Sequence, residues 1–175
     1  MLPSQYAWLR KESGPRILSE ALRLYGVTET PGPGNTKEIM AWARKTGLAR
    51  IYTADSIAWC GLFMAYVALQ SGWDVPLNPL WARNWTGFGK PSKTPMLGDV
   101  LVFTRGSGGH VGLYVGEDAT AFHVLGGNQS DQVSIARIAK SRLIQARRCP
   151  WRVAQPKNVR RVMLASTGAL STNEA

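Results

Sequence analysis

Two residue types that often decide the chemistry of a small protein are scarce in this chain. Its 175 residues include only two cysteines, Cys60 and Cys149, and two histidines, His110 and His123. Two cysteines are too few for a disulfide framework. The four Cys and His residues also lack the regular spacing of a zinc motif. We therefore expect no metal and no cofactor, so any chemistry has to depend on very few nucleophilic and basic side chains.

Long apolar runs are also missing from the chain. No stretch of eighteen or more apolar residues occurs, so no membrane-spanning helix is expected. The first ten residues lack the basic region and the apolar region of a signal peptide. We therefore expect synthesis in the cytoplasm of a host cell without a recognisable signal peptide.

Acidic residues are few, and their distribution is uneven. The chain has 21 basic and 11 acidic side chains and a net charge of +10. The segment over residues 137–161 contains nine basic residues and no acidic residue. The nine are Arg137, Lys140, Arg142, Arg147, Arg148, Arg152, Lys157, Arg160 and Arg161. Such a block either attracts polyanions, such as nucleic acid or anionic envelope polymers, or forms a solvated basic edge. Nucleic acid is not expected as a partner, because no basic helix or recognition motif accompanies the block.

The order of apolar patterns predicts an α+β fold in a single domain. Apolar residues recur at helical spacing over residues 13–26, 36–46 and 57–71. Short apolar or alternating segments follow and predict strands over residues 100–103, 111–115, 121–125, 133–137 and 143–148. Helices followed by a meander of strands indicate helices packed on an antiparallel sheet of five or six strands.

The segments outside these helices and strands predict a long loop inside the domain and the boundaries of the domain. Residues 73–97 are rich in Pro, Asn, Trp and Gly and predict a site-forming loop with a short helix around residues 81–85. We expect an N-terminal arm over residues 1–14, one domain over residues 15–164 and a disordered tail over residues 165–175. A monomer is expected.

Cys60 is the candidate nucleophile. It lies close to the start of the helix expected over residues 57–71. A helix N-terminus favours a thiolate, and its backbone N–H groups can hold a developing oxyanion. The alternative for a lone cysteine is a small buried core residue. Cys149 is expected to take no part.

His110 is the preferred candidate base for this thiol. It follows the glycine-rich turn over residues 106–109 and opens a strand, where an imidazole can stay accessible. His123 lies in the middle of a strand, where it is expected to pack or to face solvent.

A thiol–imidazole pair needs a third group that orients the ring. Asn128 follows a strand and two glycines, which let the backbone bring it close to the imidazole. Gln129 and Asp131 remain alternatives for this role. Cys60, His110 and Asn128 thus form the expected catalytic set, in a papain-like arrangement of one helix packed on a sheet.

Four motifs in order carry a resemblance to a known family. They are Trp-Cys-Gly-Leu-Phe-Met-Ala-Tyr from residue 59, Gly-Asp-Val-Leu-Val-Phe from residue 98, Gly-His-Val-Gly-Leu-Tyr-Val-Gly from residue 109 and Leu-Gly-Gly-Asn-Gln-Ser-Asp from residue 125. In this order the chain resembles the CHAP and NlpC-type cysteine peptidoglycan hydrolases. More narrowly, it is similar to the small bacterial and phage proteins of that superfamily that keep a Gly-Gly-Asn-Gln segment.

The resemblance implies hydrolysis of an amide bond in bacterial cell-wall peptidoglycan through a thioester on Cys60. The bond is either the sugar–peptide link or one within the stem peptide. A phage lysin that acts on the cell wall is the expected role, and a tail-associated protein or a secreted effector remain alternatives. The expected substrate-binding residues are Tyr52, Trp59, Trp81, Trp85 and Gln129. A basic protein without catalytic activity, binding nucleic acid or an anionic envelope, is the alternative function.

Overall fold

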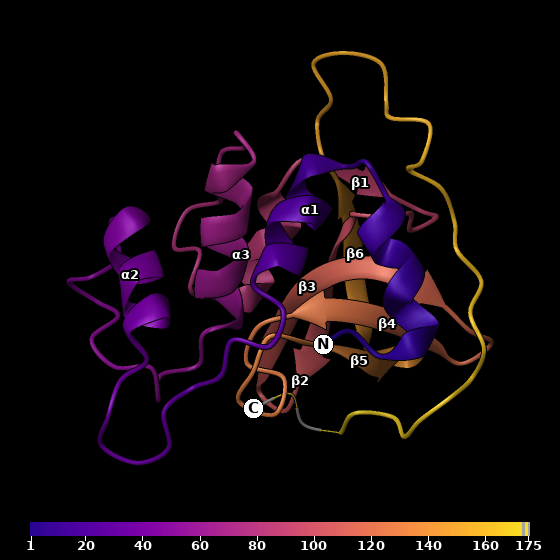
Figure 1. Ribbon diagram of the computed structural model, residues 1–175. Coiled ribbons are helices and arrows are strands. Elements are labelled where there is room, and N and C mark those ends of the chain that lie inside the picture. The colour runs from indigo at the N-terminus through magenta and orange to yellow at the C-terminus, as the bar shows by residue number, and fades with distance from the viewer. Residues whose placement is uncertain (173, 175) are drawn as a thin grey trace.

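The computed structural model describes residues 1–172 and residue 174, which form one helical layer against one sheet (Figure 1). The α-helices are α1 (Arg16–Arg23), α2 (Lys37–Lys45) and α3 (Cys60–Gln70). Shorter 3-10 helices are η1 (Ser4–Lys11), η2 (Ala82–Gly87) and η3 (Lys140–Arg142). Helix α3 packs on the sheet, and α1 and α2 both contact α3. The three helices expected from the sequence are confirmed, each somewhat shorter than its apolar pattern.

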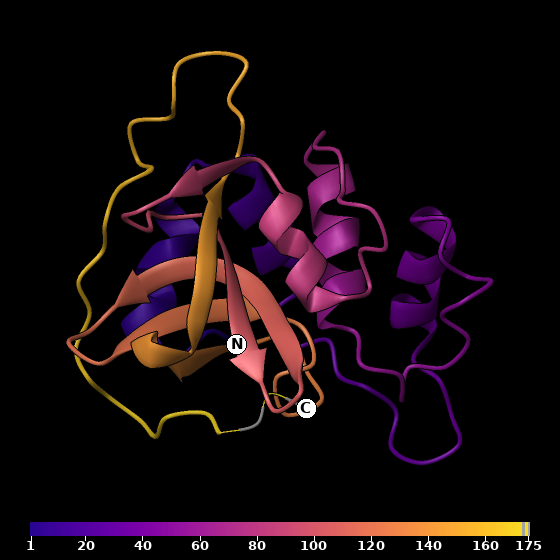
Figure 2. The same ribbon diagram turned by 180° about the vertical axis from the view of Figure 1, so that it is seen from behind.

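Six antiparallel strands form the sheet, in the order β1-β6-β2-β3-β4-β5. Their bounds are β1 (Lys90–Ser92), β2 (Val100–Arg105), β3 (Gly108–Glu117), β4 (Ala121–Gly126), β5 (Ser134–Ala139) and β6 (Leu143–Arg148). Seen from behind, the sheet is strongly curved (Figure 2). The short helix η2 contacts β3, β2 and β6. The expected α+β class with an antiparallel sheet is therefore confirmed. Strand β1 was not expected, because its sequence Lys-Pro-Ser has no apolar alternation.

Alternation along the strands gives the sheet two apolar faces. On β2, Val100 and Val102 belong to the core shared with the helices, whereas Leu101 and Phe103 belong to a second cluster. Successive side chains on a strand point to opposite faces, so β2 supplies both clusters. Tyr114 on β3 extends the second cluster. The helices cover one face only, and Val162, after the last strand, packs against the second cluster.

The N-terminal segment, expected to be an arm, packs against the domain. Its residues Tyr6 and Leu9 are buried in η1. The Tyr6 hydroxyl lies 2.6 Å from Nδ1 of His123 on β4, which ties η1 to the sheet. An apolar face on η1 explains this packing, because burying two large side chains offsets the entropy of ordering a short helix.

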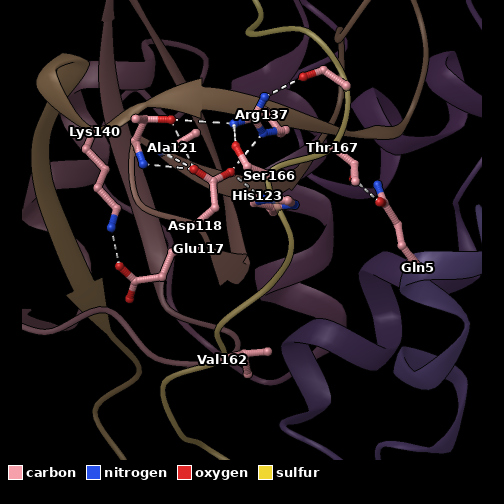
Figure 3. A network of polar contacts seen from close by, with 12 residues as sticks. Gln5, Glu117, Asp118, Ala121, His123, Arg137, Lys140, Val162, Ser166 and Thr167 are labelled. Carbon is pink, nitrogen blue, oxygen red and sulfur yellow. Dashed lines mark hydrogen bonds and ion pairs between the residues drawn. The ribbon is translucent and has the colours of Figure 1, made fainter.

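The segment after β6 runs along the outer side of the sheet and returns to its lower end (Figure 1). Arg137 on β5 holds it there, donating hydrogen bonds to the Gly168 carbonyl and to the Ser166 hydroxyl (Figure 3). The Ser171 N–H donates to the Arg137 carbonyl at 2.8 Å. Disorder was expected over residues 165–175. Residues 173 and 175 lie outside the described residues, whereas Ser166, Gly168 and Ser171 are held by these contacts. None of the helices in the described part of the chain is long and apolar enough to cross a membrane.

Candidate active site

Cys60 is the first residue of α3, closer to the helix end than the sequence indicated. Its neighbour Gly61 packs against the backbone of Pro79 and Leu80, where a side chain would collide with two carbonyl groups. The glycine after the cysteine therefore lets the loop over residues 73–81 close over the helix start.

The Cys60 thiol borders a hollow of about 310 Å³ between this loop and the β2–β3 turn. The hollow is lined by Ile57, Ala58, Cys60, Leu80, Trp81, Ala82, Arg105 and Gly109. Only 3% of Cys60 is exposed, and its burial raises the pKa of the thiol. The positive charge of Arg105 and the backbone N–H of Val111 act in the opposite direction. The resting form of Cys60 at neutral pH is therefore the thiol, although the helix start alone would favour the thiolate.

His110 lies on β3 and is fully buried. Its burial lowers the pKa of the imidazole to about 4, so the ring is neutral at neutral pH. The ring nitrogen Nε2 lies 3.1 Å from Oε1 of Gln129, whereas Nδ1 is buried without a hydrogen-bond partner among the described residues. One nitrogen of the imidazole is therefore engaged, and the other is available.

The contacts of Gln129 decide which nitrogen of His110 carries the proton. Its amide nitrogen donates to the carbonyls of Val124 and Ser134, at 3.2 Å and 2.6 Å. These two acceptors fix the orientation of the carboxamide, so Oε1 is the atom that faces His110. An oxygen can only accept from the ring, so the proton resides on Nε2 and the lone pair on Nδ1.

The orienting hydrogen bond therefore comes from Gln129, and the expectation that Asn128 makes it is corrected. The Asn128 carboxamide instead accepts a hydrogen bond from the N–H of Trp59 at 3.1 Å. This bond ties the turn after β4 to the residue before Cys60. The expected substrate-binding role of Gln129 is also corrected, because its side chain is buried and both of its polar atoms are engaged.

The two glycines before Asn128 make room for these contacts. A Cβ on Gly126 would lie 3.0 Å from Gln129 Oε1 and 3.2 Å from His110 Nε2. A Cβ on Gly127 would lie 2.7 Å from both Trp59 and Phe63. The four residues of the Gly-Gly-Asn-Gln segment therefore contribute in different ways. Gly126 and Gly127 leave space, Asn128 holds the start of α3, and Gln129 orients the imidazole of His110.

Cys60 and His110 share a neighbourhood without a hydrogen bond between them. The backbone N–H that acts on the thiol belongs to Val111, the residue after His110 on β3. Arg105 borders the same hollow as Cys60, and its charge influences the pKa of both Cys60 and His110. Since Nδ1 of His110 has no partner in the described part of the chain, the thiol does not donate to it in this resting state. Catalytic hydrogen bonds are often absent before substrate binds, so the arrangement remains compatible with proton transfer.

Three of the four aromatic residues expected to line a substrate groove belong to the core instead. Tyr52, Trp59 and Trp85 are completely buried. The Trp59 indole donates to Glu29 at 2.8 Å and the Trp85 indole to the Pro79 carbonyl at 2.9 Å, which satisfies both polar ends. Trp81 is 74% exposed and borders the hollow beside Cys60.

The sequence analysis missed Arg105, which borders the same hollow. The available signal was weak: a single basic residue between a strand and the glycine-rich turn before His110. Its place next to Cys60 follows from the β2–β3 hairpin, in which Arg105 faces Gly108.

Most of the basic block over residues 137–161 is paired within the molecule. Six of its nine side chains contact carboxylates: Arg137 with Asp118, Lys140 and Arg161 with Glu117, Arg142 with Glu174, Arg148 with Asp99, and Arg160 with Glu12. Arg147 donates to the carbonyls of Phe88 and Gly89. The block is therefore not the continuous free basic surface that its sequence suggested. Among the described residues, no cluster of His, Cys, Asp and Glu could hold a metal ion.

The fold and the site define a class of protein. A cysteine opens a helix that packs on an antiparallel sheet, and a histidine on that sheet has its ring oriented by a carboxamide, which is the papain-like arrangement. Residues 52–128 match the family model of the CHAP domain, which confirms the resemblance to CHAP-type peptidoglycan hydrolases. CHAP domains are typically cysteine-dependent hydrolases or amidases of peptidoglycan. The comparison with curated proteins found no match.

Proposed function

We propose that this chain hydrolyses an amide bond of bacterial peptidoglycan through a thioester on Cys60, with His110 as the base and Gln129 as the residue that orients it. The observation that carries the proposal is the fixed tautomer of His110. Gln129 keeps the proton on Nε2 and leaves the lone pair of Nδ1 buried and unengaged by the described residues. A lone pair of this kind is what a neutral thiol needs in order to lose its proton.

The reaction follows from these groups. When a scissile carbonyl enters the hollow, Nδ1 of His110 takes the Cys60 proton while the sulfur attacks the carbonyl carbon. Backbone N–H groups at the start of α3 stabilise the oxyanion. The C–N bond breaks, and the leaving amine takes the proton from the imidazolium. Water, deprotonated by His110, then hydrolyses the thioester and restores the thiol.

The proposed site of action is the bacterial cell wall, and the proposed role is that of a phage lysin. The motif order and the CHAP match support peptidoglycan as the substrate. Two targets fit this chemistry, the sugar–peptide amide and a bond within the stem peptide. Mass spectrometry of the products distinguishes them, because an amidase releases stem peptides without sugar whereas an endopeptidase leaves shortened stems on the sugar.

The test uses purified cell walls and the variant Cys60→Ala, with Cys149→Ala as the matched control. We expect turbidity loss by the wild type and by Cys149→Ala, and none by Cys60→Ala. Cys149 is a free, buried thiol whose burial raises its pKa to about 12, so it cannot supply a nucleophile at neutral pH. Lysis by a correctly folded Cys60→Ala variant would overturn the proposal.

The alternative, a basic binding protein, has less support. Its main argument was the cluster of basic residues, and most of these are neutralised by carboxylates of the same chain. Among the described residues, Arg147, Arg152 and Lys157 have no carboxylate partner, and Arg147 instead donates to backbone carbonyls. A steep salt dependence of binding to nucleic acid or to anionic vesicles would favour the alternative.

A further inference from the structure

Arg105 differs from most other basic residues because it reaches the hollow beside Cys60. It ends β2, opposite Gly108 at the turn into β3. Together with Trp81 and Gly109 it lines the space that the thiol borders. Its guanidinium is the charged group in the lining of this space, so a molecule that enters would meet it.

The Arg105 side chain is partly buried, and one of its donor atoms is unsatisfied. Its Nη1 atom is shielded from solvent and has no hydrogen-bond partner among the described residues. No carboxylate in the described part of the chain lies within ion-pair distance of Arg105, although six arginines and lysines of the block over residues 137–161 have one. Leaving a buried charged donor without a partner costs free energy, which a bound acceptor would recover.

The charge of Arg105 also acts on the reacting groups. It opposes the effect of burial on the Cys60 pKa, and it adds to the lowering of the His110 pKa. Arg105 and Cys60 line the same hollow, so the guanidinium and the thiol face one space. A ligand group held by Arg105 would thus lie next to the bond that Cys60 attacks.

We propose that Arg105 binds a free carboxylate of the substrate, so that the site selects peptides bearing a carboxylate next to the scissile amide. The proposal rests on the proposed function, since it takes Cys60 as the nucleophile. A guanidinium presents parallel N–H groups that match the two oxygens of a carboxylate, and this pairing is stronger than a neutral hydrogen bond. The exposed ring of Trp81 would cover the apolar part of the same substrate residue.

This chemistry narrows the substrate class. In a peptide joined through the side-chain carboxyl of a glutamate, the α-carboxylate of that residue stays free beside the amide bond. Amidation of that α-carboxylate removes the charge without changing the shape of the peptide. The preferred substrate is therefore a γ-linked glutamyl peptide with a free α-carboxylate, and the amidated form is the poorer one.

Two alkylating reagents of nearly equal size test the carboxylate site without any cell-wall substrate. Iodoacetate carries a carboxylate and iodoacetamide a neutral amide; in both, the sulfur–carbon bond forms as iodide leaves. Intact mass gives the two initial rates, and peptide mapping assigns the label to Cys60 rather than to Cys149. We expect the ratio of the iodoacetate rate to the iodoacetamide rate at Cys60 to exceed that of a neutral model thiol by about tenfold, the usual contribution of a charged hydrogen bond.

The variant Arg105→Gln should return this ratio to that of the model thiol, and Arg105→Lys should restore part of it. Arg152→Gln, at an exposed arginine outside the lining of the hollow, is the matched control and should leave the ratio unchanged. An equal fall of both rates in Arg105→Gln would assign Arg105 to stabilisation of the thiolate and overturn the proposal. A ratio equal to that of the model thiol in the wild type, or no labelling of Cys60 by either reagent, would overturn it as well.

A binding experiment keeps this proposal separate from the proposed function. Calorimetry on Cys60→Ala compares a γ-glutamyl stem peptide with its α-amidated form. We expect tighter binding of the carboxylate form by about tenfold, and loss of the difference in Cys60→Ala combined with Arg105→Gln. A preserved difference with no wall cleavage by the wild type would support Arg105 and reject the hydrolase. Wall cleavage without any difference would reject Arg105 and leave the hydrolase intact.

Discussion

The two histidines of this protein lie on adjacent strands, are equally buried, and have opposite surroundings. His123 on β4 uses both ring nitrogens: Nδ1 lies 2.6 Å from the Tyr6 hydroxyl, and Nε2 lies 2.9 Å from Asp118. His110 on β3 uses Nε2 only, and its Nδ1 has no partner among the described residues. A buried histidine with two partners stabilises the fold, whereas one with a free nitrogen retains the capacity to react.

The polar groups around His123 all have hydrogen-bond or ion-pair partners in one network. Arg137 donates to the same carboxylate of Asp118 at 2.8 Å and also binds the C-terminal segment (Figure 3). The guanidinium of Arg137 holds the pKa of Asp118 far below its ordinary range. The network thereby joins η1, the sheet and the segment after β6. Around His110 the described residues leave one buried nitrogen unsatisfied, at a cost in stability.

The largest expected effect is the difference in activity between the variants His110→Gln and His123→Gln. His110→Gln should lower kcat/KM on peptidoglycan by about 10²–10⁴, the usual contribution of a general base, with a small change in stability. His123→Gln should destabilise the fold by about 1–3 kcal/mol for each buried partner left unsatisfied, while the folded fraction keeps its activity. Lysis rates and urea unfolding of the two variants measure both quantities. Loss of activity in a fully folded His123→Gln variant, or full activity in His110→Gln, would contradict the assignment of the reactive role to His110 and the structural role to His123.

A smaller effect on activity is expected from substitution of the two carboxamide residues after β4, Asn128 and Gln129. Gln129→Ala should lower kcat by about 10²-fold or less, because His110 loses the acceptor that holds its tautomer and orientation. Asn128→Ala should act mainly on stability, by about 1–3 kcal/mol, because the N–H of Trp59 loses its acceptor. Steady-state kinetics corrected for the folded fraction distinguish the two. A greater loss of kcat in Asn128→Ala than in Gln129→Ala would return the orienting role to Asn128.

The smallest effect concerns the pH dependence of stability. Burial lowers the pKa of His110 to about 4, below the ordinary histidine value of about 6.5 in the unfolded chain. Between these values the unfolded chain binds more protons, so the free energy of unfolding falls as the pH drops from 6.5 towards 4. His110→Gln should flatten this slope by up to about 1.4 kcal/mol per pH unit.

His123→Gln should flatten the same slope less. Burial lowers the pKa of His123 too, but Asp118 opposes the shift. Urea unfolding at several pH values between 4 and 7 measures the slopes for the wild type and both variants. Equal slopes in the wild type and in His110→Gln would show that His110 is not titrated by unfolding in this range.

The local patterns of the sequence predicted most of the fold. Helical spacing identified the three α-helices, and alternation identified five of the strands, since each depends on neighbours a few residues apart. Segments that depend on distant partners escaped prediction. Strand β1 forms only because β6 pairs with it, and η1 is ordered by His123, far along the chain.

The candidate site divides in the same way. The motifs were sufficient to propose Cys60 and His110 as the reacting residues, because a cysteine near a helix start and a histidine after a glycine-rich turn are local signals. The choice between Asn128 and Gln129 was not local. Both are carboxamides next to each other in one turn, and only the carbonyls of Val124 and Ser134 determine which one faces the imidazole. Burial of Tyr52, Trp59 and Trp85 could not be inferred from aromatic character, which suits a core and a groove equally.

The α+β class, the order of the elements and the family motifs can all be read from the amino-acid sequence, because periodicity and turn residues act over short distances. Three properties of the site cannot: which nitrogen of His110 is free, which carboxamide holds it, and which basic side chains keep an unpaired charge. They depend on atoms that folding brings together from distant parts of the chain. Arg105 shows the difference most directly, since its sequence neighbours give little signal and its place beside Cys60 exists only in the folded protein.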